Sequence, residues 1–400
     1  MEQIIFNIGL IIILGILSIK ILDKVRVPKF FIFLLMGVIL GPFCFNIISA
    51  EFLSLNQEIS VLAIIILLVR AGLSLNREAI LKVGRPAFEM SCIPTIVEGL
   101  AITVIAHYIL NISFIEAGML GFILAPVASA ILVPRMLSFM KKGYGSKKGI
   151  PTMLLVGSGA DDVVAITIFS AFLSMYFGGN SNLLGEIIGI PLSIIIGIIF
   201  GLVFGYIVLK TFKHWEFSNV EKLFFVLGVA ILLNALEGIF EGIIPVAGLV
   251  GVMVVGFLII DKAPSLGKTL SEEFSYLWFI AEMIVFVLLG AQLQLNLLAD
   301  LLVPGLIIVS LGLIARSIGV YISLIKTGLN NKEKLFCIIS YMPKANTQAT
   351  IGILPLAAGV ASGEIILAIT GIAIIFTAPI GAILTEIAGN RLLAHDGAEN

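Results

Sequence analysis

The amino-acid sequence predicts an all-α polytopic membrane protein. Hydrophobic residues make up 60% of the 400 residues and charged residues only 12%, whereas ordinary soluble domains carry about 25% charged residues. The apolar runs are continuous and about twenty residues long, which is the length that a helix needs to cross the hydrocarbon core. The strands of a membrane β-barrel would instead give alternating segments of about ten residues. The net charge of -1 argues against a nucleic-acid partner.

We interpret thirteen apolar runs as transmembrane helices. They cover approximately residues 3–21, 30–48, 58–73, 88–108, 113–133, 150–173, 184–209, 221–239, 243–260, 275–294, 303–325, 335–356 and 365–388. The first run follows no basic region and precedes no clear cleavage site, so we expect a span and not a cleaved signal peptide. Cys44, Cys92 and Cys337 fall in or beside apolar runs, where a thiol behaves as a small apolar group. No disulfide, resident metal or cofactor is therefore expected.

The basic residues indicate the orientation of the spans, because short cytoplasmic loops are rich in Lys and Arg. All but three of the 24 Lys and Arg residues lie around the odd-numbered connections or in the C-terminal tail. The N-terminus is therefore predicted outside and the C-terminus in the cytoplasm. We expect an integral protein of a bacterial or archaeal cell (inner) membrane.

An odd number of spans predicts two inverted six-helix repeats that are joined by a linker helix. Spans one to six begin outside, whereas spans eight to thirteen begin inside. The seventh span would be the linker, and its glycines Gly197, Gly201 and Gly205 predict close packing against a neighbouring helix. Inverted repeats are the usual architecture of secondary transporters, which bind their substrates at mid-membrane where paired helices break.

Two adjacent carboxylates, Asp161 and Asp162, lie in the middle of the sixth apolar run. A charge at the centre of a membrane helix costs at least about 2.5 to 3.5 kcal/mol, so such residues usually face a polar cavity and act in ion or proton transfer. The alternative is that both aspartates form purely structural ion pairs. Two neighbouring acids need more partners than one, which favours a functional role.

We interpret seven charged residues as intramembrane charges. They are Arg70, Glu98, Asp161, Asp162, Glu282, Arg316 and Lys344. Three cations and four carboxylates leave one negative charge for a mobile ion. Arg70 and Glu282 are expected to pair structurally, with a cytoplasmic funnel as the alternative.

Two spans in corresponding positions of the repeats are predicted to be broken. The fifth contains Pro126 and Ser129, and the twelfth contains Pro343, Asn346 and Thr347. Proline removes one intrahelical hydrogen bond and clashes with the preceding turn. The freed backbone groups can bind a desolvated cation or be satisfied by neighbouring side chains. Simple kinks without function remain the alternative.

Several motifs together resemble the second family of monovalent cation:proton antiporters, and in particular its NHA-type sodium/proton branch. They are Gly159-Ala160-Asp161-Asp162-Val163-Val164-Ala165-Ile166-Thr167, Arg70-Ala71-Gly72-Leu73, Thr95-Ile96-Val97-Glu98, Met342-Pro343-Lys344-Ala345, Gln348-Ala349-Thr350-Ile351-Gly352 and Thr377-Ala378-Pro379-Ile380-Gly381-Ala382. The double aspartate alone would be a weak signal, but the set covers most of the chain. This chain differs at Asn346 and Thr347, where the branch more commonly has threonine then valine, at positions that bear on ion preference.

The resemblance implies a homodimer in which a core transport domain moves against a dimerisation domain. The dimerisation domain would comprise residues 1–85 and 213–300, the linker helix residues 179–212, and the core domain residues 86–178 and 301–400. The two helices that cross in the core domain would be the two broken spans, the fifth and the twelfth.

The resemblance also implies the roles of individual residues. Asp162 would carry the cation and the proton, with Asp161 beside it. Lys344 would neutralise one aspartate when no cation is bound, and Glu98 and Arg316 would form an ion pair across the core. The expected transported species are protons and sodium or lithium, which are hard cations that prefer oxygen ligands.

Other functions remain alternatives at this point. A potassium/proton antiporter, a sodium-coupled symporter or a channel on a related inverted-repeat fold would also explain the broken helices. An enzyme is not expected, because aspartyl catalysis needs two carboxylates from different backbone segments and these two are consecutive. The sequence also contains no His-Glu-x-x-His or Gly-x-Ser-x-Gly motif.

Overall fold

The computed structural model describes residues 2–22, 29–74, 84–177, 183–240 and 246–395, and every regular element within these ranges is an α-helix. In chain order the helices are α1 (Glu2–Leu22), α2 (Lys29–Leu40), α3 (Ala50–Leu53), α4 (Asn56–Ser74), α6 (Arg85–Leu110), α7 (Phe114–Leu124), α8 (Ser129–Lys141), α9 (Ile150–Phe177), α10 (Leu183–His214), α11 (Asn219–Ile239), α12 (Gly248–Lys262), α13 (Pro264–Gln292), α14 (Leu295–Asp300), α15 (Leu302–Ser323), α16 (Asn331–Ser340), α17 (Asn346–Ile351), α18 (Leu354–Ala357) and α19 (Gly363–Leu392). The predicted all-α class is confirmed for these residues.

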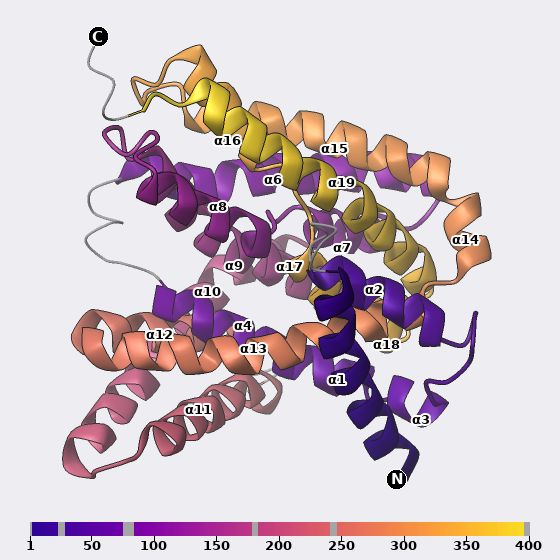
Figure 1. Cartoon of the computed structure of the whole chain (residues 1–400), viewed down its shortest axis with the longest axis horizontal. Helices are drawn as coiled ribbons and strands as arrows, with labels where there is room; N and C mark the ends of the chain where they lie inside the picture. The colour runs from indigo at the N-terminus through magenta and orange to yellow at the C-terminus, as the bar shows by residue number, and fades with distance from the viewer. Residues whose placement is uncertain (1, 23–28, 75–83, 178–182, 241–245, 396–400) are drawn as a thin grey trace.

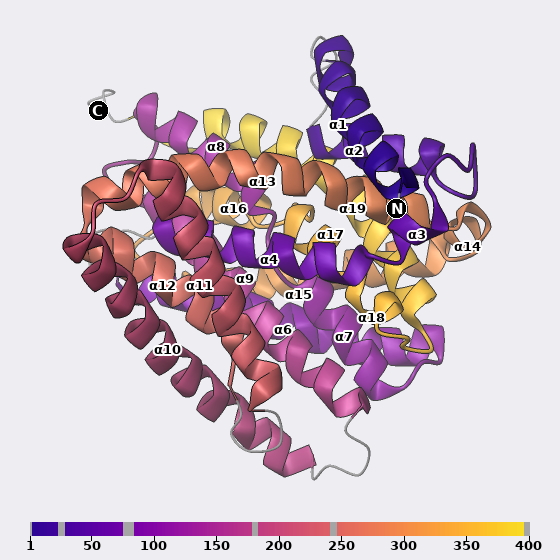
Figure 2. The ribbon, with the colours of Figure 1, turned by 90° about the horizontal axis from the view of Figure 1, so that it is seen from below.

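The helices form two groups (Figure 1). One group contains α6 to α9 and α15 to α19, and its helix α6 packs against α15, α7 and α9. The other contains α1, α2, α4 and α11 to α13, with α13 packed against α2 and α4. Helix α10 runs along the outer edge of the molecule and packs on α12 (Figure 2).

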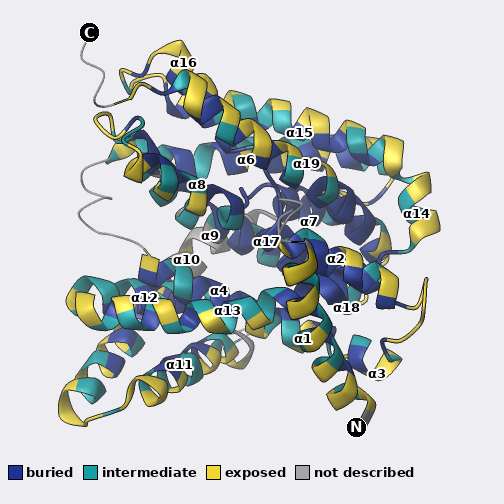
Figure 3. Cartoon of the chain, viewed as in Figure 1, coloured by how far each residue is buried: buried dark blue, intermediate teal, exposed yellow. Residues whose placement is uncertain are grey.

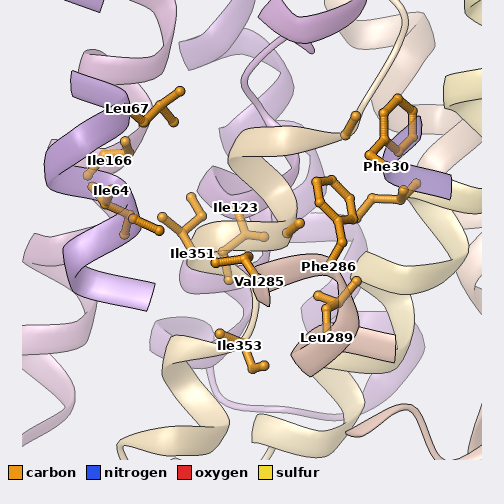
Figure 4. Close-up of a cluster of buried hydrophobic side chains, with 14 of the residues drawn as sticks. Phe30, Ile64, Leu67, Ile123, Ile166, Val285, Phe286, Leu289, Ile351 and Ile353 are labelled. Carbon is orange, nitrogen blue, oxygen red and sulfur yellow. The ribbon is translucent and has the colours of Figure 1, made fainter. Parts of the chain in front are cut away.

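Buried apolar side chains join the two groups. Figure 4 shows Ile64 of α4 and Phe286 of α13 in one cluster with Ile123 of α7, Ile166 of α9 and Ile351 of α17. The peripheral helices α1 and α11 carry many exposed residues (Figure 3). Such exposed apolar side chains suit a protein that is surrounded by lipid, whose hydrocarbon is as apolar as the side chains themselves.

Among the described residues, ten helical segments are long and apolar enough to cross a membrane. Each of the thirteen predicted spans overlaps a helix or an interrupted pair of helices, although residues 243–245 of the predicted ninth span lie outside the described residues. Helices α2 and α12, with 12 and 15 residues, are shorter than a typical span. The chain is thus an integral membrane protein with multiple apolar helices.

The predicted second span, residues 30–48, is too long. Helix α2 ends at Leu40, and residues 41–48 form turns and irregular backbone. Gly41 and Pro42 follow directly, and a proline disfavours helical backbone at the residue before it. Asn46 then adopts a positive φ of 51°, which no helix continues through.

The glycines of α10 pack closely against α12, as the sequence predicts. A methyl group added to Gly201 would lie 2.6 Å from the carbonyl oxygen of Gly251, and one added to Gly197 would lie 2.3 Å from that of Ala247. Only a residue without a side chain permits this backbone approach. The glycine-lined face of α10 therefore packs against another helix of the same chain.

Capping boxes with a polar N-cap side chain begin three of the described helices, namely α7, α11 and α16. In α7, Ser113 accepts from the backbone N–H of Glu116, and the Glu116 carboxylate accepts from that of Ser113. The same reciprocal pattern begins α11 at Ser218 and α16 at Asn330. Glu116 also accepts a hydrogen bond from the backbone N–H of Ser362, at 3.0 Å, and so ties the start of α7 to the start of α19.

Candidate functional site

Two interrupted helices meet in the interior of the first helix group. Residues 125–128 separate α7 from α8, and residues 341–345 separate α16 from α17. The breaks contain Pro126 and Pro343, as the sequence predicts. The two segments are joined directly, because the backbone N–H of Ala128 donates to the carbonyl oxygen of Pro343 at 2.8 Å.

Cationic and amide side chains satisfy the carbonyl groups that are freed where α7 ends. Ala125 O accepts from the Lys344 ammonium at 3.2 Å and from the Arg316 guanidinium. Pro126 O accepts from Gln348 Nε2 at 2.6 Å and from Lys344 Nζ at 3.4 Å. The last carbonyls of a helix have no partner within the helix and carry its partial negative charge, so cations are stabilised there.

Acceptor oxygens satisfy the N–H groups that are freed on the other side of each break. The backbone N–H of Val127 donates to Asp161 Oδ2 at 2.8 Å. The backbone N–H of Ala345 donates to Gln348 Oε1 at 2.7 Å, and that of Lys344 to Thr377 Oγ1 at 2.9 Å. The polar groups of both breaks are therefore held mainly by side chains of other segments.

A buried ionic network surrounds the breaks. Glu98 Oε2 accepts from Arg316 Nη1 at 2.8 Å and from Lys344 Nζ at 2.7 Å, and Arg316 Nη2 lies 2.9 Å from Asp161 Oδ2. All four side chains are at most 1% exposed. Arg316 Nε donates to the carbonyl oxygen of Tyr341 at 2.5 Å, so the guanidinium contacts acceptors on four different segments.

The partners of Lys344 and Arg316 differ from those expected. The sequence predicts that Lys344 neutralises one aspartate, but in the structure its ammonium binds Glu98 and the two carbonyl groups of the first break. Arg316 pairs with Glu98, as the resemblance implies, and also supplies the cation beside Asp161. A guanidinium has donors on three nitrogens in one plane and can bridge two carboxylates, whereas an ammonium is a single point charge.

Asp162 differs from its neighbour in having no cationic partner. Its side chain is 2% exposed, and its Oδ1 accepts from the Thr347 hydroxyl at 2.7 Å. Among the described residues Asp162 forms no ion pair within 4.0 Å. Adjacent helical residues point about 100° apart, which explains why Asp161 and Asp162 reach different partners.

Asn346 links the two interrupted helices next to Asp162. Its Nδ2 donates to Ser129 Oγ at 3.0 Å, and its Oδ1 accepts from the backbone N–H of Ala130 at 3.2 Å. Asn346 and Ser129 are the first residues of α17 and α8. All the residues that the sequence analysis assigned to the two breaks thus lie together in one buried polar region.

The sequence analysis assigned no role to Tyr341, Gln348 and Thr377. Tyr341 binds Arg316 through its carbonyl oxygen, and its ring centroid lies 5.2 Å from the guanidinium. Gln348 and Thr377 satisfy backbone groups of the breaks. Their signal in the sequence is that each is a polar residue within five positions of a proline in an apolar span, where few polar side chains are without a partner.

Arg70 and Glu282 lie apart from this network. Arg70 belongs to α4 and Glu282 to α13, both in the other helix group. Within the described part of the chain neither side chain forms a hydrogen bond or ion pair with Glu98, Asp161 or Arg316. The site is therefore built from α6, α9, α15, α19 and the two interrupted helices.

The chain is similar to known sodium/hydrogen exchangers. A family described as "Sodium/hydrogen exchanger, transmembrane" matches residues 9–388. "Sodium/hydrogen exchanger 9B2" of Bison bison bison is 33% identical over 344 residues, which are 83% of this chain and 63% of that protein. "Sodium/hydrogen exchanger 9B1" of Macaca fascicularis is 30% identical over 413 residues, which are 96% of this chain and 78% of that protein. The chain thus spans less than two thirds of the bison relative.

A solved structure shares the fold. The sodium proton antiporter MjNhaP1 from Methanocaldococcus jannaschii superposes with a TM-score of 0.86 at 23% sequence identity, with 98% of this chain and 99% of that chain covered. The resemblance that the motifs carry is confirmed by the family match, and the chain belongs to the transmembrane sodium/hydrogen exchanger family.

Proposed function

We propose that the protein is a secondary active antiporter that exchanges sodium or lithium for protons by alternate binding at Asp162. The observation that carries this proposal is the contrast between the two aspartates. Asp161 is paired with Arg316, whereas Asp162 is buried beside a hydroxyl group and forms no ion pair with any described residue. An unpaired carboxylate in a buried site is stabilised by a proton or by a metal ion.

The charge balance of the network supports the same mechanism. Three carboxylates, Glu98, Asp161 and Asp162, face two cations, Arg316 and Lys344. One monovalent cation or one proton neutralises the remaining negative charge. Binding of one excludes the other, and this competition couples their opposite movements. Arg316 keeps its charge throughout, because arginine is not deprotonated in proteins.

The proposal includes the assembly that the sequence predicts. Thirteen membrane crossings would form two inverted repeats around the linker α10, and the group with α6 to α9 and α15 to α19 would be the moving core domain. The other group would form the interface of a homodimer. The two interrupted helices support this assembly, since they occupy corresponding positions of the predicted repeats.

We expect proton competition to be visible in the wild-type protein. If one carboxylate binds both species, the sodium concentration for half-maximal exchange must rise as the pH falls, by up to tenfold per pH unit. The measurement is sodium-, lithium- or potassium-driven proton efflux from proteoliposomes with a pH-sensitive dye inside, over a range of pH. An apparent affinity that stays flat with pH would contradict single-site competition. Proton and sodium flux in the same direction would favour a symporter instead.

The proposed orientation places the α8–α9 connection in the cytoplasm and the α2–α4 connection outside. We expect a single cysteine at Ser54 to react with an impermeant thiol reagent in intact cells and one at Ser146 to react only after the membrane is opened. Both are tested in a chain without Cys44, Cys92 and Cys337. The reverse pattern of labelling would invert the topology.

A further inference from the structure

The hairpin between α15 and α16, residues 321–335, combines positive charge with an exposed apolar surface. We propose that this hairpin binds an anionic phospholipid of the adjacent leaflet, with the headgroup held by Lys326 and Lys334 and an acyl chain along α15. The inference depends on the proposed orientation only in naming this leaflet as the cytoplasmic one.

The first helix group carries a surplus of positive charge at the end of the molecule where α16 begins and α19 ends (Figure 1). There, residues 141–149, 324–334 and 386–395 contain two carboxylates, Glu333 and Glu386, and eight cations. The cations are Lys141, Lys142, Lys147, Lys148, Lys326, Lys332, Lys334 and Arg391. The α10–α11 and α12–α13 connections, residues 210–222 and 261–273, instead contain five cations and five carboxylates. The bias of cytoplasmic loops toward basic residues applies to all these connections, so the surplus indicates an additional anionic partner.

Both carboxylates of this surface already have cationic partners. Glu333 is 3% exposed, and its Oε2 lies 2.9 Å from Lys148 Nζ. Glu386 Oε2 lies 2.5 Å from Arg135 Nη1. Within the described part of the chain, three lysines of the hairpin form no ion pair within 4.0 Å, namely Lys326, Lys332 and Lys334. Their charge can therefore be balanced by an anion from outside the chain.

Lys334 is positioned by an aromatic ring. Its Nζ lies 5.2 Å from the ring centroid of Tyr321, near the end of α15. The face of an aromatic ring attracts an ammonium group at this distance. This attraction uses none of the lone pairs of an acceptor, so the three N–H donors of the ammonium group can still bind phosphate oxygens. The cation is thus held at the surface in a form that can bind a headgroup.

Exposed apolar side chains beside these lysines favour a lipid over a soluble anion. Ile325 and Leu335 are 56% and 46% exposed. Further exposed apolar residues follow α15 at a spacing of three or four, which places them on one face of the helix: Val303, Ile307, Leu311, Ile314 and Ile318. A soluble anion would contact only the lysines. A phospholipid contacts the lysines with its headgroup and the apolar face of α15 with an acyl chain, and basic pockets beside membrane helices bind such headgroups.

Fluorescence quenching by nitroxide-labelled lipids measures binding at this hairpin. Leu335→Cys is labelled with bimane in the chain without Cys44, Cys92 and Cys337 and is reconstituted in phosphatidylcholine nanodiscs. Nitroxide-labelled phosphatidylglycerol or nitroxide-labelled phosphatidylcholine is then added at equal amounts. We expect phosphatidylglycerol to quench as if it were at least about fivefold more concentrated at the site, which is the effect of about one lysine beside an anionic headgroup.

Phe224→Cys is the matched control site for the label. Phe224 lies near the start of α11, as Leu335 lies near the start of α16, and it is 57% exposed. It follows the α10–α11 connection, whose charges are nearly balanced. The two lipids should therefore quench a label at Phe224 equally. The same preference for phosphatidylglycerol at both sites would contradict a site on the hairpin.

Charge-neutralising variants test the two lysines. Lys326→Gln with Lys334→Gln should remove the preference at the Leu335 label, whereas Lys210→Gln with Lys213→Gln should leave it unchanged. These lysines are exposed or half-buried, and melting temperatures in detergent check that the variants fold. Equal quenching by the two lipids in the otherwise unchanged chain, or a preference that survives loss of both hairpin lysines, would overturn the inference.

Two further measurements test the aromatic contact and the nature of the ligand. Tyr321→Leu should weaken the preference, whereas Tyr321→Phe should keep it, because a phenyl ring still attracts an ammonium group. Soluble glycerol 3-phosphate should not displace the lipid. Loss of the preference on its addition would show that any phosphate binds, and would overturn the assignment to a lipid.

This experiment is independent of the proposed function. Lipid binding in nanodiscs requires neither ion exchange nor one orientation of the chain, so its failure would leave Asp162 as the proposed carrier. Conversely, a sodium affinity that stays flat with pH would contradict the antiport mechanism and leave the lipid site intact.

Discussion

Replacement of Asp162 by asparagine is expected to abolish cation-driven proton movement. The amide is nearly isosteric with the carboxyl group and still accepts the Thr347 hydrogen bond, but it can neither hold a proton nor charge-balance a cation. Asp162 has no ion pair among the described residues, so the change strands no buried cation and the protein should fold normally. Exchange in proteoliposomes should fall to the level of empty vesicles for sodium, lithium and potassium.

Two further variants make this result specific. Asp300→Asn removes the same charge at an exposed site at the end of α14 and should retain full exchange. Asp161→Asn deprives Arg316 of one carboxylate and should reduce both exchange and thermal stability. If Asp162→Asn retained near wild-type exchange, another buried carboxylate would have to carry the ion, and Glu98 would be the first candidate.

Loss of the Arg316 guanidinium is expected to cause the largest loss of stability. Arg316→Gln leaves Glu98 and Asp161 without their shared partner, and removal of one member of a buried ion pair costs about 3 to 5 kcal/mol. It also leaves the carbonyl groups of Ala125 and Tyr341 short of a donor. Glu98→Gln should cost less, because Arg316 then keeps Asp161 and Lys344 keeps two carbonyl groups.

A double-mutant cycle measures the coupling in this pair. Melting temperatures in detergent are compared for Arg316→Gln, Glu98→Gln, the double variant and the wild type, with Arg135→Gln as a control for a half-exposed arginine that pairs with Glu386. We expect the double variant to lose less than the sum of the single losses, by roughly 0.5 to 3 kcal/mol of coupling. Additive losses would mean that the two side chains do not interact in the folded protein.

The positions of the helices and of their breaks could be predicted from the sequence, because both depend on local features. Continuous apolar runs fix the helices, and Pro126 and Pro343 inside such runs mark the breaks. The early end of α2 was also encoded locally, in Gly41 and Pro42, although length alone had suggested a longer span.

The partner of each buried charge could not be predicted in the same way. Lys344 was expected beside an aspartate, but its ammonium binds Glu98, 246 residues earlier in the chain. Which carboxylate an amine reaches depends on how the two interrupted helices cross, and no local pattern determines that crossing. The pairing of Arg316 with Asp161 depends likewise on the packing of α15 and of α9 against α6.

The mutual support of the two breaks has a consequence for biosynthesis. Ser129 and its partner Asn346 are 217 residues apart, so a ribosome that adds about 5 to 20 residues per second completes the second break roughly 10 to 40 seconds after the first. During that interval the carbonyl groups of Ala125 and Pro126 lack Lys344 and Gln348. Nascent chains that stop before Met342 should therefore be cleaved by a membrane-embedded quality-control protease far faster than the completed chain, as pulse-chase labelling would measure.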